Sequence, residues 1–394
     1  MRFTRPKLIG SKRWPIAIFI IANYLYSLTA YAQNSLEKKE LMAKTPQKAL
    51  LTTTQNTVHK TMHKAPGKAV SQNATGPAYS TRADAMSWAD DMAERRNLDR
   101  DWVRRAIGEA HHLTIVAKFI TPPPAGTVKN WRVYRSRFID PVRIQAGVRF
   151  WQGNREALER AEKEYGVPAE IIVGIIGVET IYGQQVGNFR VIDALATLTF
   201  DFPGAHPRAQ ERREFFQGEL EQFLSLTSRT GEDPMAVRGS FAGAMGLPQF
   251  MPSSYVKYAI DFDGDGKIDL FNSAADVIGS VASYLKAFNW QPGMPTHYPV
   301  AFDRSRLDLD ALMAPDILPT FSVASFTAKG AVLEGDALNH TGPLALVELQ
   351  NAGAESVYVA GTENFYAITR YNWSSYYAMA VIELGREVAR TLNR

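Results

Sequence analysis

Cysteine is absent from all 394 residues of the sequence. This absence excludes disulfide bonds, thiolate metal sites, a cysteine nucleophile and a lipid-modified N-terminal cysteine. Any catalysis must therefore rest on carboxylates, hydroxyl groups, histidine or a metal ion bound by oxygen. The length predicts two or three packed units, and a hydrophobic content of 45% is ordinary for a soluble globular protein.

Acidic residues are absent from the first 32 positions, which carry five Lys or Arg side chains. An apolar segment, residues 14–28, follows these charges, and Ala30 and Ala32 then offer small side chains before Gln33. This order is typical of a secretory signal peptide, residues 1–32, that is cleaved before Gln33. The alternative is a retained membrane anchor, for which the apolar segment is short.

The charge of the chain is unevenly distributed. Residues 33–80 hold seven Lys and two Glu with little apolar periodicity, which predicts a disordered linker. The formal net charge of the whole chain is +4, but residues 81–394 taken alone carry about −6. A mildly acidic folded part makes nucleic acid an unfavourable partner.

Apolar residues recur at spacings of three and four from residue 84 onward, which predicts a mainly α protein. Between residues 290 and 350 the pattern changes to short Val, Leu and Phe runs with Pro and Gly, which predict a small β subdomain. We expect helices in segments 84–113, 141–165 (with an interruption near Gly153), 168–179, 191–200, 213–226, 274–288 and 364–392.

The stretch Val167–Gly187 places a carboxylate, Glu179, directly after the apolar run Ile171–Val178. Because this run is apolar on every face apart from its glycines, we expect a helix buried in a core, with Pro168 as its first residue. Burial raises the pKa of a carboxyl group and lets it hold a proton near neutral pH, as a general acid must. The alternative is a structural glutamate that pairs with an arginine or reaches solvent.

Residues 239–255 (GSFAGAMGLPQFMPSSY) combine glycines and two prolines with apolar side chains. This composition predicts a tight, buried loop whose backbone approaches another group closely, with Ser240 and Gln249 among its polar members. A glycine-rich packing loop would have a similar sequence.

Alternating aspartates from residue 261, with Gly266 in the sixth place, match the opening of a calcium loop of the EF-hand type. Asn272 stands where such a loop has its closing glutamate, so a later aspartate closes the site if the loop is longer than standard. A solvated acidic turn is the alternative. We expect a bound calcium ion to be structural, and its candidate ligands are Asp261, Asp263, Asp265, Lys267 through its carbonyl, and Asp276.

Four motifs in this order resemble the lytic murein transglycosylases of the membrane-bound B type, and the resemblance covers residues 84–394. They are GIIGVET, the 239–255 loop, DFDGDG followed by IGSVASYLKAFNW, and ITRYN with YYAMAV. The resemblance implies a mainly α fold (α+β) in which a lysozyme-like core carries an N-terminal helical domain and a small inserted β subdomain. We therefore expect a helical domain at 81–160 with 188–237, a core at 161–290 with the calcium loop 261–276, a β subdomain at 291–354, and the rest of the core at 355–394.

The same resemblance implies roles for individual residues. Glu179 matches the single catalytic acid/base, and Ser240 and Gln249 match polar residues that orient it and the substituents of the sugar. Aromatic faces suit the apolar C–H patches of sugar rings, although ordinary core packing is the alternative for each of them. The residues that match the lining of the glycan cleft are Tyr134, Tyr284, Tyr371, Asn372 and Tyr377.

The activity implied by the resemblance is cleavage of the β-1,4 bond between N-acetylmuramic acid and N-acetylglucosamine in peptidoglycan, with a 1,6-anhydro product. A lysozyme-type hydrolase, which needs a second carboxylate, and a non-catalytic calcium-stabilised peptidoglycan-binding protein stay open as alternatives. We expect peptidoglycan glycan strands as the partner, a periplasmic location, no nucleic acid and no lipid anchor. Association with cell-wall synthesis or division complexes is left open.

Overall fold

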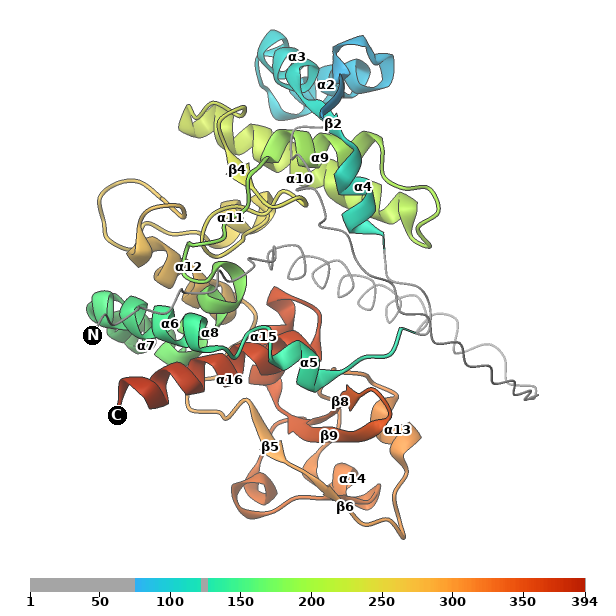
Figure 1. Ribbon diagram of the computed structural model, residues 1–394, viewed down its shortest axis with the longest axis vertical. Helices are drawn as coiled ribbons and strands as arrows, with labels where there is room; N and C mark the ends of the chain where they lie inside the picture. The colour runs from blue at the N-terminus through green and yellow to red at the C-terminus, as the bar shows by residue number, and fades with distance from the viewer. Residues whose placement is uncertain (1–74, 122–126, 394) are drawn as a thin grey trace, which may run out of the picture.

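The computed structural model describes residues 75–121 and 127–393. Figure 1 shows three parts one above another: an upper group of helices, a central group of helices and a lower part that contains the longest strands. Helices dominate the described residues, as predicted. The predicted signal peptide and residues 33–74 of the predicted linker lie outside the described residues. Within the described ranges, every helix is too short or too polar to cross a membrane.

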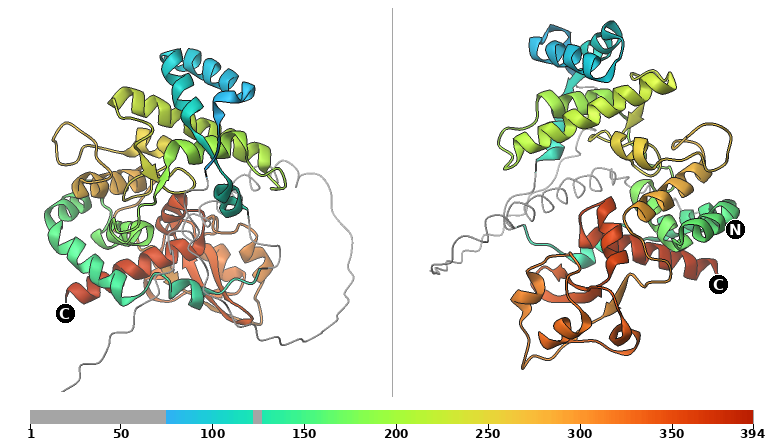
Figure 2. Two further views of the ribbon diagram at one scale, coloured as in Figure 1. Left: turned by 45° about the horizontal axis from the view of Figure 1, so that its top comes forward. Right: turned by 180° about the vertical axis from the view of Figure 1, so that it is seen from behind.

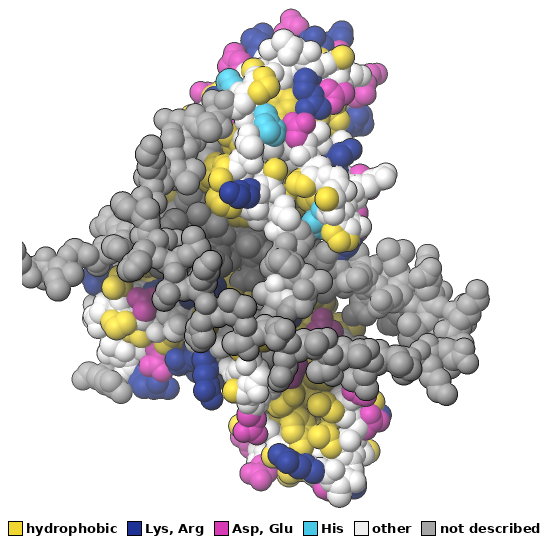
Figure 3. All heavy atoms as spheres, turned by 45° about the vertical axis from the view of Figure 1, so that its right-hand side comes forward, with side chains coloured by type: hydrophobic (Ala, Val, Ile, Leu, Met, Phe, Trp, Pro, Cys, Tyr) yellow, Lys and Arg dark blue, Asp and Glu magenta, His cyan; other side chains and the backbone are white. Residues whose placement is uncertain are grey.

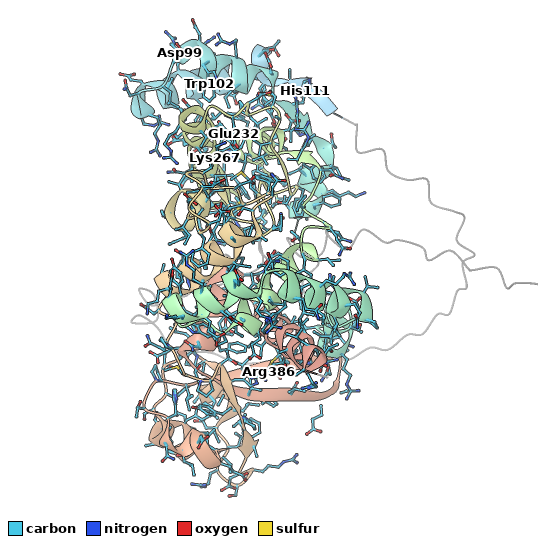
Figure 4. All side chains as sticks on the ribbon, turned by 90° about the vertical axis from the view of Figure 1, so that its left-hand side faces the viewer. Asp99, Trp102, His111, Glu232, Lys267 and Arg386 are labelled. Atoms are coloured by element: carbon cyan, nitrogen blue, oxygen red, sulfur yellow. The ribbon has the colours of Figure 1, made fainter. Side chains whose placement is uncertain are left out.

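The upper part buries one cluster of apolar side chains that joins its first helices to two later ones. Helix α3 (Arg100–Glu109) begins after Asp99, whose carboxylate accepts a hydrogen bond from the backbone N–H of Trp102 at 2.6 Å (Figure 4). Such a cap satisfies a helix N–H that would otherwise lack a partner. The elements are β1 (Thr75–Ala78), η1 (Tyr79–Thr81), α2 (Ala83–Arg96), α3 (Arg100–Glu109), β2 (His111–Leu113), α4 (Thr114–Ile120), β3 (Phe189–Arg190), α9 (Val191–Phe200), α10 (Ala209–Thr230) and β4 (Arg238–Gly239).

The end of the predicted linker is corrected by the structure. Strand β1 pairs with β2, and the side chain of Tyr79 is buried while its hydroxyl donates a hydrogen bond to Asp201 at 2.6 Å. Residues 75–80 therefore belong to the folded part and not to the linker. A segment this short has no periodicity, so only its contacts with distant residues distinguish it from a linker.

Charged side chains of both signs are intermixed on the upper part of the molecule, as Figure 3 shows. Several of them form exposed ion pairs, for example Arg100 with Asp90 and Arg96 with Glu221. Exposed pairs of this kind each contribute about 0–1 kcal/mol, so the stability of the upper part rests on its apolar cluster.

The central part buries the largest apolar cluster of the described residues. Trp131, Phe138 and Leu158 belong to it, so residues 131–160 pack in the core and not in the helical domain to which the sequence analysis assigns them. Helical periodicity indicates that a helix has an apolar face, but it does not identify the core that covers this face. The elements are α5 (Trp131–Arg135), α6 (Pro141–Gly153), α7 (Arg155–Tyr165), α8 (Ala169–Thr180), α11 (Pro252–Tyr258), α12 (Ala274–Ala287), α15 (Glu363–Tyr371) and α16 (Ser375–Leu392).

Helix α8 lies at the centre of this core, and α16 packs along it. Pro168 is the N-cap residue, so the helix starts at Ala169, one residue later than predicted. A Cβ atom on Gly174 would lie 2.2 Å from a carbonyl oxygen of α16, and one on Gly385 would lie 2.0 Å from a carbonyl oxygen of α8. Because glycine has no Cβ, the two helix backbones touch directly at these positions.

The lower part has its own apolar cluster and an antiparallel sheet with the strand order β5-β9-β8. The right-hand view of Figure 2, which shows the molecule from behind, places the lower part below α15 and α16. Strand β9 continues to Gly361, so the predicted boundary at residue 354 would separate two paired strands and is corrected. The elements are β5 (His297–Pro299), β6 (Ala301–Phe302), α13 (Leu309–Met313), α14 (Val323–Ala328), β7 (Ala331–Val332), η2 (Gly335–Asn339), β8 (Ala345–Asn351) and β9 (Ala354–Gly361).

Candidate active site

Glu179 lies in the last turn of α8, and only 6% of its surface is exposed. The hydroxyl of Tyr377, on α16, donates a hydrogen bond to its Oε1 atom at 2.6 Å. Burial raises the pKa of Glu179 from 4.5 to about 8, and the hydrogen bond from Tyr377 partly opposes this rise. The C-terminal end of a helix also disfavours a negative charge. Glu179 therefore holds a proton near neutral pH, and none of the described arginines forms an ion pair with it.

Three of the predicted tyrosines form a continuous series of ring contacts that leads away from the acid. The rings of Tyr377 and Tyr371 are stacked with centroids 6.4 Å apart, and those of Tyr371 and Tyr284 are 4.7 Å apart. The Tyr371 hydroxyl donates to the carbonyl of Pro248 at 2.5 Å, and the Tyr284 hydroxyl donates to that of Arg370 at 2.6 Å. All three rings are buried and pack in the core, and of the three only Tyr377 is hydrogen-bonded to the acid among the described residues.

Tyr134 and Asn372 differ from these three tyrosines in their surroundings. Tyr134 is half-buried on α5, where its ring stacks on Trp131 and meets the edge of Tyr376. Asn372 is 2% exposed, and its Oδ1 atom has no hydrogen-bond partner among the described residues. A buried amide oxygen without a partner is a candidate acceptor for a ligand, because buried polar groups are normally hydrogen-bonded.

Ser240 and Gln249 are both buried in the glycine-rich loop, as predicted. The Oγ atom of Ser240 accepts a hydrogen bond from the backbone N–H of Ala244 at 2.9 Å. Gln249 has a left-handed backbone (φ 53°), and its side-chain amide donates to the carbonyls of Gly246 at 2.9 Å and Val186 at 3.2 Å. These bonds shape the loop, and among the described residues neither side chain is hydrogen-bonded to the acid.

Thr180, to which the sequence analysis assigns no role, connects the acid helix to this loop. Its hydroxyl donates a hydrogen bond to the carbonyl of Leu247 at 2.9 Å and accepts one from the backbone N–H of Gly183 at 3.1 Å. The only hint of this role in the sequence is a hydroxyl residue directly after the acid. The bond fixes the distance between the end of α8 and the loop.

The acidic loop lies between α11 and α12 (Figure 1). It brings three of its predicted ligands together. Carboxylate oxygens of Asp261, Asp263 and Asp276 all lie within 4.8 Å of one another. Asp265 is not in this group, and its Oδ1 atom accepts a hydrogen bond from the backbone N–H of Lys267 at 2.8 Å. Converging carboxylate oxygens are the donors that calcium prefers, so these residues fit that ion.

Ser273 also belongs to this loop, although the sequence analysis does not single it out. Its hydroxyl donates a hydrogen bond to Asp263 at 2.6 Å, and it caps α12 by accepting one from the backbone N–H of Asp276 at 3.2 Å. Asp276 in turn accepts hydrogen bonds from three backbone N–H groups, those of Phe262 at 2.7 Å, Asp269 at 2.8 Å and Asp263 at 3.4 Å. The buried carboxylate of Asp276 therefore joins both ends of the loop.

Known proteins resemble this chain over most of its length. Residues 80–386 match the family model described as the Transglycosylase SLT domain. The membrane-bound lytic murein transglycosylase B of Escherichia coli (strain K12) is 40% identical over 330 residues, which cover 80% of this chain and 85% of that protein.

Two solved structures extend the comparison to the fold. The E. coli lytic transglycosylase Slt35 in complex with calcium has a TM-score of 0.69 at 38% identity, over 83% of this chain and all of that one. SltB3 from Pseudomonas aeruginosa in complex with NAG-NAM-pentapeptide has a TM-score of 0.63 at 28% identity, over 77% of this chain and 79% of that one. The expected fold class is thereby confirmed, and the chain belongs to the family of lytic transglycosylases that carry the SLT domain.

Proposed function

We propose that this protein is a peptidoglycan lytic transglycosylase that uses Glu179 as its single acid/base. The observation that carries the proposal is a buried carboxyl group whose pKa is raised to about 8, at the end of the central helix of a lytic-transglycosylase fold. The substrate bond is the β-1,4 linkage between N-acetylmuramic acid and N-acetylglucosamine, and the product carries a 1,6-anhydro ring.

The reaction requires two proton transfers at one carboxyl group. Protonated Glu179 gives its proton to the glycosidic oxygen as the C1–O bond breaks, and the N-acetyl carbonyl of the substrate stabilises C1. The carboxylate of Glu179 then takes the proton of the sugar's own 6-hydroxyl, whose oxygen closes the ring on C1. Glu179 is protonated again at the end, and no water enters the product. A pKa near the working pH suits a group that must act first as an acid and then as a base.

The surroundings of Glu179 favour this reaction over hydrolysis by two carboxylates. Ordinary glycosidases place a second carboxyl group about 5–9.5 Å from the acid. Among the described residues, the pKa of Glu179 is shifted by burial and by Tyr377, and no second carboxylate contributes. In this proposal the hydrogen bond from Tyr377 stabilises the carboxylate form of Glu179. The Oδ1 atom of Asn372, which has no partner among the described residues, accepts a hydrogen bond from the sugar. Ser240, Gln249, Tyr134, Tyr284 and Tyr371 border the bound glycan.

Calcium has a structural role in this proposal. Asp261, Asp263 and Asp276 would hold the ion, and its charge would relieve the repulsion among three converging carboxylates. The proton transfers need only Glu179 and the substrate. The relative Slt35, whose structure contains calcium, supports this choice of ion.

We infer a periplasmic location, because the proposed substrate, peptidoglycan, is found there. The order of charged, apolar and small residues in positions 1–32 supports export through a signal peptide, with cleavage before Gln33. Finding Met1 at the N-terminus of the protein isolated from a membrane fraction would favour the retained anchor instead.

Mass analysis of the products from purified peptidoglycan tests the proposal. We expect muropeptides with a 1,6-anhydro end, each lighter by one water molecule than the product of hydrolysis. Glu179→Gln should release none, whereas Glu170→Gln, at the other end of the same helix, should retain activity. Hydrated products would identify a hydrolase, and a wild-type protein that binds peptidoglycan without products would identify a binding protein. Either result contradicts the proposal.

A further inference from the structure

A buried arginine on α6 contacts α8, the helix that carries Glu179. Arg143, on α6, is completely buried, and its Nε atom donates a hydrogen bond to the carbonyl of Gly177 at 3.0 Å. Its Nη1 atom donates to the carbonyl of Arg137 at 2.6 Å and to the carboxylate of Asp140 at 2.9 Å. Gly177 precedes Glu179 by two residues, so the guanidinium holds the turn that carries the acid. A positive charge is also favourable at the carbonyl end of a helix.

The chain directly after α8 folds back to the same place. Ile181 and Tyr182 both have left-handed backbone conformations, with φ values of 51° and 55°. This conformation is costly for branched and bulky residues and occurs mainly where the surrounding structure enforces it. The Tyr182 ring then packs against Phe150 of α6, with centroids 5.2 Å apart.

Two glycines make room for the hydroxyl of Tyr182 between α6 and α8. A Cβ atom on Gly147 or on Gly177 would lie 2.4 Å from this oxygen. Arg143, Gly147 and Phe150 are spaced at i, i+4 and i+7, so one face of α6 supplies all the contacts. Arg143 and Tyr182 thus contact the end of α8 at the same turn, that of Gly177.

Stability alone does not account for this arrangement. The Nη2 atom of Arg143 and the hydroxyl of Tyr182 are buried and have no hydrogen-bond partner among the described residues. Burying unpaired polar atoms costs free energy, and apolar side chains of similar volume often fill such a space at a lower cost. The need to hold Glu179 in a fixed orientation explains the buried Arg143 and Tyr182 better than stability does.

We propose that Arg143 and Tyr182 are positioning residues that fix the last turn of α8 and thereby the direction in which the carboxyl group of Glu179 points. We call this pair the Arg143–Tyr182 clamp. Proton transfer depends steeply on geometry, since a displacement of about 1 Å can lower a rate about a hundredfold. The inference rests on the proposed role of Glu179.

A pair of glycine variants tests the clamp without removing a charge. Gly177→Ala places a methyl group against the Tyr182 hydroxyl, whereas Gly218→Ala, in the interior of α10, meets nothing within 4 Å. We expect Gly177→Ala to lower kcat at least about tenfold while KM stays within about twofold, because the glycan contacts are unchanged. Gly218→Ala should keep the wild-type kcat and KM.

Arginine variants test the other half of the clamp. Arg143→Met should remain folded and lose at least about tenfold in kcat at unchanged KM, and Arg143→Lys, which keeps one donor, should lie between it and the wild type. Arg149→Met, on the exposed face of the same helix, is the matched control. If Arg143→Met does not fold, Arg143→Lys and Gly177→Ala decide the question.

The outcomes separate this inference from the proposed function. Folded Arg143 and Gly177 variants with wild-type kcat would overturn the clamp, and so would a loss that appears in KM alone. If the wild-type protein yields no anhydro product in the same assay, the proposed function fails instead. Melting temperatures measured for each variant show whether a lower rate reflects unfolding.

Discussion

Replacing Glu179, the proposed catalytic acid, should make this protein more stable at neutral and alkaline pH. The pKa of Glu179 is raised from 4.5 to about 8 in the folded state, so the folded protein holds this proton more tightly than the unfolded chain does. Below pH 4.5 both states are protonated and no free energy is lost. As the pH rises toward 8, the unfolded chain ionises first, and the wild-type protein loses about 1.4 kcal/mol of stability per pH unit.

Glutamine keeps the shape of the side chain but cannot ionise, so Glu179→Gln removes this loss. At pH 7 the gain should be about 3 kcal/mol, and it should level off near about 5 kcal/mol above pH 8. Tyr377 can still donate its hydrogen bond to the side-chain oxygen of glutamine. The same change should lower turnover by a factor of about 10² to 10⁴ or more, because the acid/base is lost.

Urea denaturation of both proteins between pH 4 and pH 9 measures the effect. The stability curves should coincide at pH 4, diverge between about pH 4.5 and pH 8, and run parallel above pH 8. Glu170→Gln is the control and should show a smaller gain, because Glu170 is only partly buried and Arg386 opposes the rise in its pKa. A difference that does not grow with pH, or a wild-type protein that is the more stable one at pH 8, would refute the reasoning.

Two other perturbations have defined outcomes. Tyr377→Phe removes the hydrogen bond that lowers the pKa of Glu179. The alkaline limb of the kcat/KM profile, which we expect near pH 8 in the wild type, should therefore move to higher pH, and kcat should fall. A shift of this limb to lower pH would contradict the role of Tyr377. Calcium at a hundred times its Kd should stabilise the folded protein by about 2.7 kcal/mol in thermal melts, and Asp263→Ala should abolish the effect while Asp91→Ala, on the exposed face of α2, retains it. Loss of activity in chelated protein that is still folded would mean that calcium takes part in the reaction.

The features that could be predicted from the sequence are those that local spacing determines. The apolar run before Glu179 indicates a buried helix because every face of it is apolar, and the alternating aspartates of the acidic loop indicate convergence because they are close in sequence. The resemblance to a known family added Tyr377, which lies 198 residues from the acid it contacts.

Other features depend on tertiary packing, which periodicity does not reveal. Arg143 occupies a fully buried position in an otherwise amphipathic helix, and nothing in its neighbours marks it as buried. Residues 131–160 have the pattern of any amphipathic helix, so their assignment to the wrong core could be corrected only from the structure. Asp265 has the spacing of a ligand, but its carboxylate does not converge with those of Asp261, Asp263 and Asp276.

The contact between α8 and α16 also determines when the chemistry becomes available. Glu179 and Tyr377 meet only when α16 docks on α8, and they lie 198 residues apart in the sequence, with the whole lower part between them. Closing a loop of this length costs chain entropy before the contact repays it. Before that step Glu179 is hydrated, its pKa is near the ordinary value, and at neutral pH it has no proton to give. In this proposal an incompletely folded chain is inactive, and the ability to cleave peptidoglycan arises only in the native state.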